Sequence, residues 1–167
     1  PDWVYEEEFA FNRALEFSPD SKMLAFIRFD EREVPSYTFP VFAGEVPHIA
    51  PYEKYPGEYT YKYPKTGEIN LPLEEGGYIP RIRFTQDPNK LAIMTLNRHQ
   101  NRFDLYFADP RSTVCKLAVR DESDTYIREN VFDNIIFYPE TFSFVSERNG
   151  YNHLYWYNIN GNLIKQV

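Results

Sequence analysis

Short runs of apolar residues alternate with clusters of Pro, Asn, Asp and Gly along most of the chain. Short runs bounded by turn-forming residues are typical of β-strands. One stretch repeats without gaps at a constant offset of 49 residues, Leu96–Ala118 on Val145–Val167. Leu105-Tyr106-Phe107 then falls on Leu154-Tyr155-Trp156, and both copies have the order strand, polar turn, strand, polar turn, strand. The pattern therefore predicts repeated antiparallel units.

A second repeat includes the beginning of the chain. The stretches Phe17–Phe26 and Phe84–Ile93 have the same spacing from an aromatic residue to a leucine, with a tight Pro, Asp or Asn turn between two strands. Four short antiparallel strands in about 45 residues are typical of a β-propeller blade. A β-sandwich also contains short strands, but it does not repeat one hairpin pattern at fixed spacing. We therefore expect an all-β chain with about three four-stranded blades, too few to close a propeller.

The chain divides into five predicted segments. They are an acidic helical motif at 1–13, a first blade at 14–34 and 64–79, a Pro/Tyr-rich arm at 35–64, a second blade at 80–120 and a third blade at 121–167. The first blade has room for only two of its strands, so we expect residues to be missing near Asn70 and Leu71. Between Phe137 and Phe142 there is too little chain for a strand and a turn, so a second omission is expected near Pro139.

The arm contains six of the 13 prolines and six of the 14 tyrosines. Proline at this density excludes a central strand. Within the arm, Glu58–Tyr63 alternates at period two and predicts an edge strand with three tyrosines on one face. The arm is either a surface loop that packs on its own blade or a dimer contact, since aromatic residues are enriched at interface cores. The residues expected at such a contact are Tyr37, Phe39, Tyr59, Tyr61 and Tyr63.

Charge and composition narrow the class of partner. The 18 Lys and Arg against 25 Asp and Glu give a net charge of −7, which disfavours a nucleic-acid partner. Apolar residues make up 43% of the chain and aromatic residues 18%, which is enough to fill a core and excludes general disorder. No apolar run approaches the ~18 residues of a membrane-spanning helix, and no segment reads as a secretion signal.

The sequence lacks the usual catalytic motifs. There is no G-x-S-x-G elbow, no glycine-rich phosphate loop and no H-E-x-x-H. His48, His99 and His153 lie far apart, and no Cys and His pair has zinc spacing. The single cysteine, Cys115, cannot form an intrachain disulfide and is expected to be a buried structural thiol. We therefore expect no catalytic residue, metal or cofactor in this chain.

The unusual local feature is Asp2-Trp-Val-Tyr-Glu-Glu-Glu8-Phe9, directly before the first predicted strand. Adjacent glutamates are commonly a solvated face. The alternative is a cation site, because two carboxylates can accept two of the three N–H donors of an α-ammonium. Consecutive residues diverge by about 100° around a helix, so the two carboxylates can meet on one cation only if the helix is short and held by its flanks. Trp3, Tyr5 and Phe9 are the large residues available to hold it.

The acidic heptad Asp2–Glu8 is one part of a wider pattern. The chain continues with Ala14-Leu-Glu-Phe-Ser-Pro-Asp20, Leu24-Ala25, Glu33-Val-Pro35 and Tyr63-Pro-Lys-Thr-Gly67. Together these motifs resemble the propeller of the dipeptidyl peptidase IV family and its bacterial members. The resemblance is clear from Asp2 to about Asn70 and continues more weakly from Tyr78 as generic blades. The acidic heptad is its specific part, since the Ser-Pro-Asp turn occurs in many propellers.

The resemblance implies an eight-bladed propeller joined to a C-terminal α/β-hydrolase domain, which is absent from this chain. Members of the family are serine peptidases that remove dipeptides from free N-termini when the second residue is proline or alanine. The resemblance assigns the substrate ammonium to Glu7 and Glu8, with Glu6, Trp3 and Tyr5 in support. It makes the stretch Tyr37–Lys65 the arm of a homodimer. The catalytic triad would lie outside this chain, which alone should be inactive.

Two alternative functions differ from this one in the site that they require. The chain could belong to a non-catalytic propeller that binds proteins, and a G-x-S-x-G elbow beyond Val167 would separate the two readings. A prolyl oligopeptidase that cuts within peptides is disfavoured, because it needs no paired-glutamate site. Bacterial members of the resembled family are periplasmic or cell-envelope proteins, and a single cysteine favours such a member over a disulfide-rich animal ectodomain.

Overall fold

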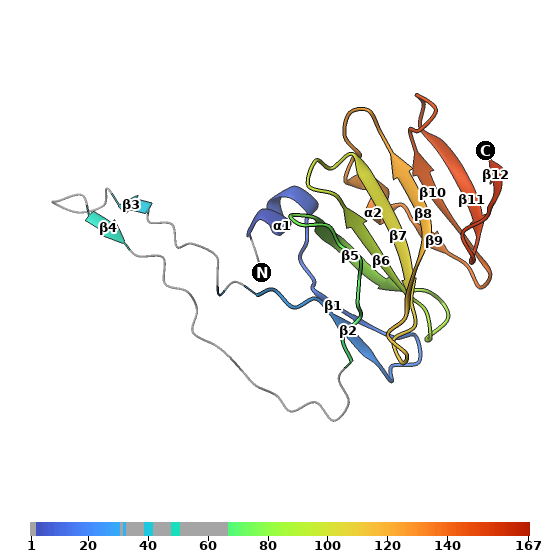
Figure 1. Cartoon of the computed structure of the whole chain (residues 1–167), viewed down its shortest axis with the longest axis horizontal. Coiled ribbons are helices and arrows are strands. Elements are labelled where there is room, and N and C mark those ends of the chain that lie inside the picture. The colour runs from blue at the N-terminus through green and yellow to red at the C-terminus, as the bar shows by residue number, and fades with distance from the viewer. Residues whose placement is uncertain (1–2, 31, 33–38, 42–47, 51–66) are drawn as a thin grey trace. The chain divides into compact units, whose positions relative to one another are not determined.

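The computed structural model describes residues 3–30, 32, 39–41, 48–50 and 67–167, and at 3, 4, 39–41 and 48–50 only the backbone. The chain forms two compact units, Pro1–Arg28 with Gly67–Val167, and Phe29–Thr66. The first unit is almost entirely antiparallel sheet (Figure 1), with two short helices, α1 (Trp3–Phe9) and α2 (Asn130–Asp133). None of the helices in the described ranges is long and apolar enough to cross a membrane.

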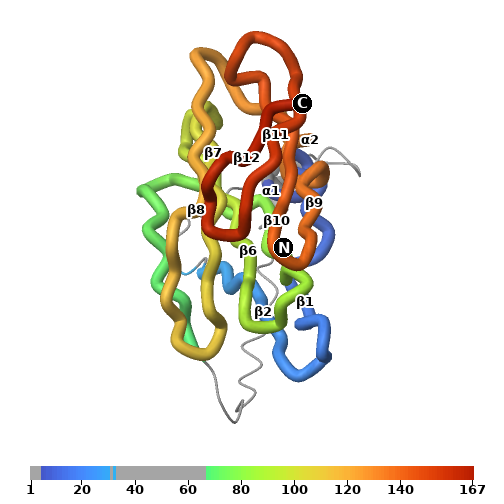
Figure 2. Tube along the Cα trace, turned by 90° about the vertical axis from the view of Figure 1, so that its right-hand side faces the viewer, coloured from blue at the N-terminus to red at the C-terminus, as the bar shows by residue number. Residues whose placement is uncertain are grey.

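Three sheets follow one another along the first unit, and each is a simple meander (Figures 1 and 2). The first sheet has two strands, β1 (Leu15–Phe17) and β2 (Leu24–Phe26). The second, called blade 2, consists of β5 (Tyr78–Phe84), β6 (Leu91–Leu96), β7 (Arg102–Ala108) and β8 (Cys115–Glu122). The third, called blade 3, consists of β9 (Ile136–Phe137), β10 (Thr141–Ser146), β11 (His153–Asn158) and β12 (Leu163–Gln166). The fold is that of propeller blades, as predicted.

The second sequence repeat, Phe17–Phe26 and Phe84–Ile93, is a repeated hairpin. Phe17 pairs with Leu24 in the first sheet, and Phe84 pairs with Leu91 in blade 2. In both hairpins the residue after the aromatic donates its backbone N–H to the carbonyl of the residue before the leucine, at 2.9 and 3.0 Å. The shared spacing from aromatic residue to leucine therefore encodes one turn geometry.

The sequence repeat at an offset of 49 residues also corresponds to a repeated pair of strands. Phe107 pairs with Lys116 in blade 2, and Trp156 pairs with Lys165 in blade 3. The register of both strand pairs also shifts close to this position. The last two strands of blade 2, β7 and β8, thus form the same kind of antiparallel ribbon as the last two strands of blade 3, β11 and β12.

Two places differ from a complete blade. In the described part of the chain the first sheet stops after β2, and its apolar face of Leu15, Phe17, Leu24 and Phe26 is 40–61% exposed. In blade 3 the short stretch between Phe137 and Phe142 does accommodate a strand and a turn. The two residues of β9 pair with β10, and the backbone N–H of Tyr138 closes the turn onto the carbonyl of Thr141 at 2.8 Å. A strand of two residues is enough here, so the prediction that this stretch is too short for a strand and a turn is wrong.

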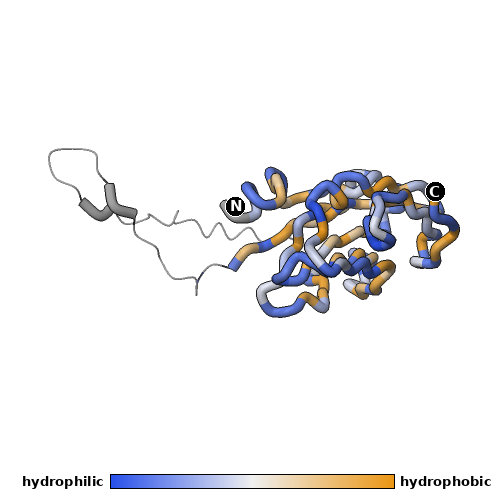
Figure 3. The backbone as a smooth tube through the Cα atoms, turned by 90° about the horizontal axis from the view of Figure 1, so that it is seen from above, coloured by the Kyte–Doolittle hydropathy of each residue, from blue (hydrophilic) through white to orange (hydrophobic). Residues whose placement is uncertain are grey.

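The core lies between successive sheets. All six residues of β6 are buried, because blade 2 is covered on both faces. One face holds a cluster of Ile82, Leu91, Ile93, Tyr106 and Ala108, onto which Ala25 and Ile27 pack. On the other face the rings of blade 2 meet those of blade 3, with 5.9 Å between the centroids of Phe103 and Phe144. Figure 3 shows apolar and polar stretches alternating along the backbone of the first unit.

The second unit contains a short hairpin that the sequence did not predict. Strand β3 (Phe39–Val41) pairs antiparallel with β4 (His48–Ala50), and Pro40 stands opposite Ile49. Proline is tolerated there because each strand of a two-stranded ribbon is an edge strand. The predicted edge strand Glu58–Tyr63 lies outside the described residues, as do Tyr37 and the side chain of Phe39.

Candidate functional site

The acidic motif forms helix α1, and Glu6, Glu7 and Glu8 are all exposed on it. The helix has only seven residues. It ends at Phe9, because the positive φ of 48° at the next residue, Ala10, breaks the helical path. The backbone N–H of Phe11 then returns to the carbonyl of Tyr5 at 3.1 Å. The three glutamates thus lie on a short helical segment that this hydrogen bond closes.

Aromatic rings hold the inner face of α1. The Tyr5 ring contacts Phe9 and Phe11 edge-on, with centroids 5.5 and 5.7 Å apart. Phe9 and Phe11 are each only 2% exposed. Residues at positions i and i+4 of a helix share a face, so Tyr5 and Phe9 turn one side of α1 inward and leave the acidic side in solvent. The side chain of Trp3, the other expected support, lies outside the described residues, and so does Asp2.

Three further groups contact α1 that the sequence did not point to. The backbone N–H of Ile79 donates to the Tyr5 hydroxyl at 3.2 Å. The Tyr78 ring lies 5.9 Å from that of Tyr5 and 5.3 Å from that of Phe9. The ring of Phe132 in α2 contacts that of Phe9 edge-on, with 6.1 Å between the ring centroids. Tyr78 and Ile79 begin β5, so helix α1 packs on the first two residues of blade 2.

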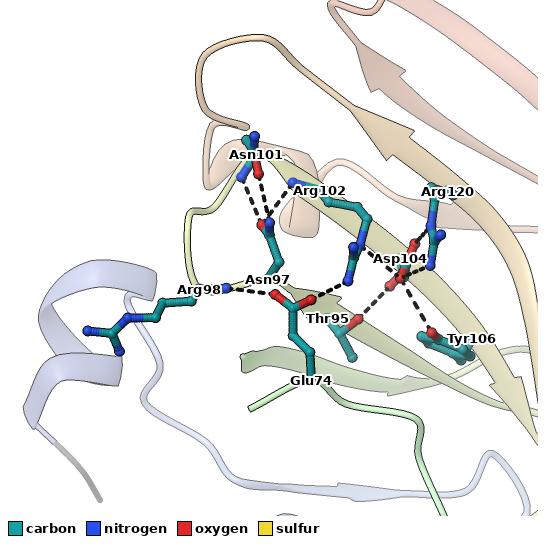
Figure 4. Close-up of polar contacts among 9 residues, drawn as sticks. All are labelled: Glu74, Thr95, Asn97, Arg98, Asn101, Arg102, Asp104, Tyr106 and Arg120. Carbon is teal, nitrogen blue, oxygen red and sulfur yellow. Dashed lines mark hydrogen bonds and ion pairs between the residues drawn. The ribbon is translucent and has the colours of Figure 1, made fainter. Parts of the chain in front are cut away.

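The loop that leads into β5 is fixed by Glu74 (Figure 4). The Glu74 carboxylate accepts hydrogen bonds from the backbone N–H of Arg98 at 3.2 Å and from the Arg102 guanidinium at 2.6 Å. The Gly77 N–H bonds to the Glu74 carbonyl at 3.0 Å, and Gly76 between them has a φ of +71°. This turn fixes the position at which Tyr78 and Ile79 begin β5.

Behind this loop lies a buried carboxylate, Asp104 of β7, which is 4% exposed. Arg120 donates two hydrogen bonds to it, at 2.7 and 2.8 Å, and the Arg102 Nε lies 3.7 Å away (Figure 4). The pair raises the pKa of the Arg120 guanidinium, mainly through the hydrogen bonds to Asp104. Burial, together with the neighbouring Asp104 charge, raises the pKa of the Tyr106 phenol. The network keeps β7 and β8 in register below the loop.

The cysteine and the three histidines that were considered in the sequence lie away from helix α1 or outside the described side chains. Cys115 begins β8 and is partly buried, and burial raises the pKa of its thiol. His99 is exposed in the turn after β6, and His153 begins β11. The side chain of His48 lies outside the described residues. Within the described ranges no group of three or more His, Cys, Asp or Glu residues is arranged to hold a metal ion.

Comparison with known proteins identifies a family that matches this chain. The family model of the dipeptidyl peptidase IV N-terminal region matches residues 1–74 and 68–167. The chain is 32% identical to dipeptidyl peptidase 4 of Arthroderma otae and 30% identical to that of Trichophyton rubrum, over 96% of this chain and 24% of each relative. It therefore spans about a quarter of the length of these relatives.

Solved structures agree with the fold. The crystal structure of Porphyromonas gingivalis dipeptidyl peptidase 4 matches all of this chain with a TM-score of 0.79 and 36% identity, over 26% of that protein. A putative dipeptidyl aminopeptidase IV from Bacteroides ovatus matches 95% of the chain with a TM-score of 0.67 and 24% identity, over 24% of its own length, and supports the fold alone.

The matches also bear on the incomplete first sheet. The two matched segments of the family model meet at residues 68–74, where the chain passes from the two-stranded first sheet to blade 2. The alignments with the fungal relatives extend over 193 residues, although this whole chain has 167. The relatives therefore contain residues that have no counterpart in this chain. With the whole chain matched and the blades in place, this chain belongs to the family of the dipeptidyl peptidase IV N-terminal region.

Proposed function

We propose that this chain is part of the propeller of a serine-type dipeptidyl peptidase that removes X-Pro or X-Ala dipeptides from free peptide N-termini. In this proposal the propeller binds the substrate ammonium, and an α/β-hydrolase domain of the same protein carries out the cleavage. Family membership supports the peptidase class, because the relatives are named dipeptidyl peptidases. The observation that supports the binding role is the acidic helix α1, which is short, closed and anchored on blade 2 with its carboxylates exposed.

The chemistry of the site follows from charge and donor count. An α-ammonium has three N–H donors, and the carboxylates of Glu7 and Glu8 would accept two of them as charge-assisted hydrogen bonds. An acetylated N-terminus has neither the charge nor these donors and would be rejected. Holding the ammonium at a fixed distance from the nucleophile would place the bond after the second residue at the reacting centre. This geometry would make the enzyme an exopeptidase that removes two residues at a time.

Two further roles belong to the proposal. Residues 35–64 would form the arm that contacts a partner subunit in a homodimer, with Tyr37, Phe39, Tyr59, Tyr61 and Tyr63 as the contact residues. Aromatic residues are enriched at interface cores, which supports this role. The compartment proposed is the periplasm or cell envelope, where bacterial proteins of this family would meet extracellular peptides.

The test uses the full-length protein that contains this chain. We would measure kcat/KM on an Ala-Pro chromogenic substrate, with a free amine and after N-acetylation, for the wild type and Glu7→Gln/Glu8→Gln. Hydrogen bonds to charged groups contribute about 1.5–3 kcal/mol each, so the double variant is expected to lose about 10²–10⁴-fold on the free-amine substrate. Glu75→Gln, an exposed acid outside α1, is the control and should be unchanged.

Either of two results would refute the amine site. One is a wild type that cleaves the acetylated substrate as well as the free one. The other is a Glu7→Gln/Glu8→Gln variant as active as Glu75→Gln. In both cases the glutamates would be a solvated helix face. An absence of any peptidase activity in the wild type would favour the non-catalytic propeller instead.

A further inference from the structure

Helix α1 cannot hold its own position. Helices shorter than ~12–15 residues are marginal in water without tertiary packing, and α1 has seven residues. Its anchor points are Tyr5 and Phe9, which stand immediately before and after the glutamates Glu6–Glu8 in the sequence. Whatever fixes these two rings therefore also fixes the carboxylates between them.

Both rings are fixed by residues far away in the sequence. The Tyr5 hydroxyl accepts the backbone N–H of Ile79, and the Tyr78 ring contacts Tyr5 and Phe9. Phe9 also meets Phe132 edge-on, at an interplanar angle of 77°. Phe132 is fully buried and also lies 5.9 Å from Phe103 of β7. We call the four rings of Tyr5, Phe9, Tyr78 and Phe132 the aromatic clamp.

We propose that the aromatic clamp positions Glu7 and Glu8 for recognition of the substrate amine, with Tyr78 and Phe132 as positioning residues. This inference rests on the proposed function. Tyr78 begins blade 2 and Phe132 lies in α2, which leads into blade 3. The amine site therefore depends on blade 2 and on the segment that joins it to blade 3, as well as on the acidic helix. Neither Tyr78 nor Phe132 touches the substrate in this scheme, so each acts only through α1.

The test compares variants that loosen the clamp with one that disturbs the core elsewhere. Tyr5→Phe removes the hydroxyl that accepts the Ile79 N–H and keeps the ring, and Phe132→Leu removes the ring beside Phe9. Phe142→Leu is the matched control, because Phe142 is equally buried but stacks on Tyr157 and contacts Phe107 instead. Each is made in the full-length protein, and rates are normalised by titrating the active serine with an amine-free fluorophosphonate.

One hydrogen bond or aromatic pair corresponds to about a 2–10-fold effect. We expect Tyr5→Phe and Phe132→Leu each to lower kcat/KM on the free-amine Ala-Pro substrate by that factor, mainly through KM. Phe142→Leu should leave the normalised value unchanged. In the Glu7→Gln/Glu8→Gln background the clamp variants should have no further effect, because the carboxylates that they position are gone.

The outcomes separate this inference from the function on which it rests. If Glu7→Gln/Glu8→Gln has no effect, the amine site itself fails and the clamp has nothing to position. If that double variant is impaired while Tyr5→Phe and Phe132→Leu match the Phe142→Leu control, the clamp is overturned and the amine site stands. Equal losses from the clamp variants with and without the glutamates would also overturn it. Faster amide hydrogen exchange in residues 5–11 of Tyr5→Phe, absent in Phe142→Leu, would support it independently of activity.

Discussion

Two glycines in the turns of blade 3 have the same backbone conformation but different surroundings. Gly150, between β10 and β11, has a φ of +85°, and Gly161, between β11 and β12, has a φ of +89°. A Cβ on Gly150 would meet no atom within 4 Å. A Cβ on Gly161 would overlap the carbonyl oxygen of Ala118 in β8 and lie 2.9 Å from its carbonyl carbon. The second glycine is therefore needed for contact between blades as well as for its turn.

This contrast gives a matched pair of substitutions. Gly150→Ala is expected to cost about 1–2 kcal/mol, the strain of a non-glycine residue at positive φ. Gly161→Ala adds the overpacking of blade 3 against blade 2, typically about 1–3 kcal/mol more. Thermal unfolding of the full-length protein should place the midpoint of Gly161→Ala clearly below that of Gly150→Ala. Equal midpoints would mean that the Gly161 turn can move away from Ala118 at no cost.

Within blade 2, the network around Asp104 joins β7 to β8 and reaches the loop below α1. Its members differ in exposure, since the Asp104 side chain is 5% exposed and that of its partner Arg120 is 44% exposed. A second Asp–Arg pair, Asp133 with Arg81 at 3.1 Å, has its carboxylate 65% exposed. The two pairs share the same chemistry, so a comparison between them isolates the effect of burying the carboxylate.

We expect Asp104→Asn to destabilise the propeller and Asp133→Asn to be nearly neutral. Loss of hydrogen bonds to a buried charged group costs about 1–3 kcal/mol, whereas an exposed ion pair contributes about 0–1 kcal/mol. The measurement is the urea midpoint of the full-length protein, which falls in proportion to the lost stability. If Asp133→Asn lowers the midpoint as much as Asp104→Asn does, the buried network is not what stabilises blade 2.

Elements formed by local pattern could be predicted, and those formed by distant contacts could not. The hairpins closed by Phe17 and Leu24 and by Phe84 and Leu91 were readable because their turn chemistry is local. The β3–β4 hairpin was missed, because proline in the sequence signals a break, although a two-stranded ribbon tolerates it. Tyr78 and Phe132 were missed as contacts of α1, since a long-range ring contact leaves no mark in a single sequence.

At the scale of the whole molecule, the first sheet, which has two strands in the described part of the chain, carries an apolar surface. Leu15, Phe17, Leu24 and Phe26 share one face of the β1–β2 hairpin and are 40–61% exposed, while Ala25 on the opposite face packs onto blade 2. At the other end of the first unit, all four residues of β12 are exposed. Exposed apolar faces and unpaired strand edges favour association between copies of a chain.

The 167-residue chain in isolation is therefore expected to self-associate at micromolar concentration. Phe17→Ser with Phe26→Ser removes the two largest side chains of the exposed hairpin face and should shift the distribution toward monomer in size-exclusion chromatography with light scattering. Tyr151→Ser is the control, because Tyr151 is 76% exposed but lies outside this face. A monomeric parent chain, or an equal shift in the control, would show that the hairpin face does not drive association. A shift confined to the double variant would show that the exposed face of the β1–β2 hairpin drives the association.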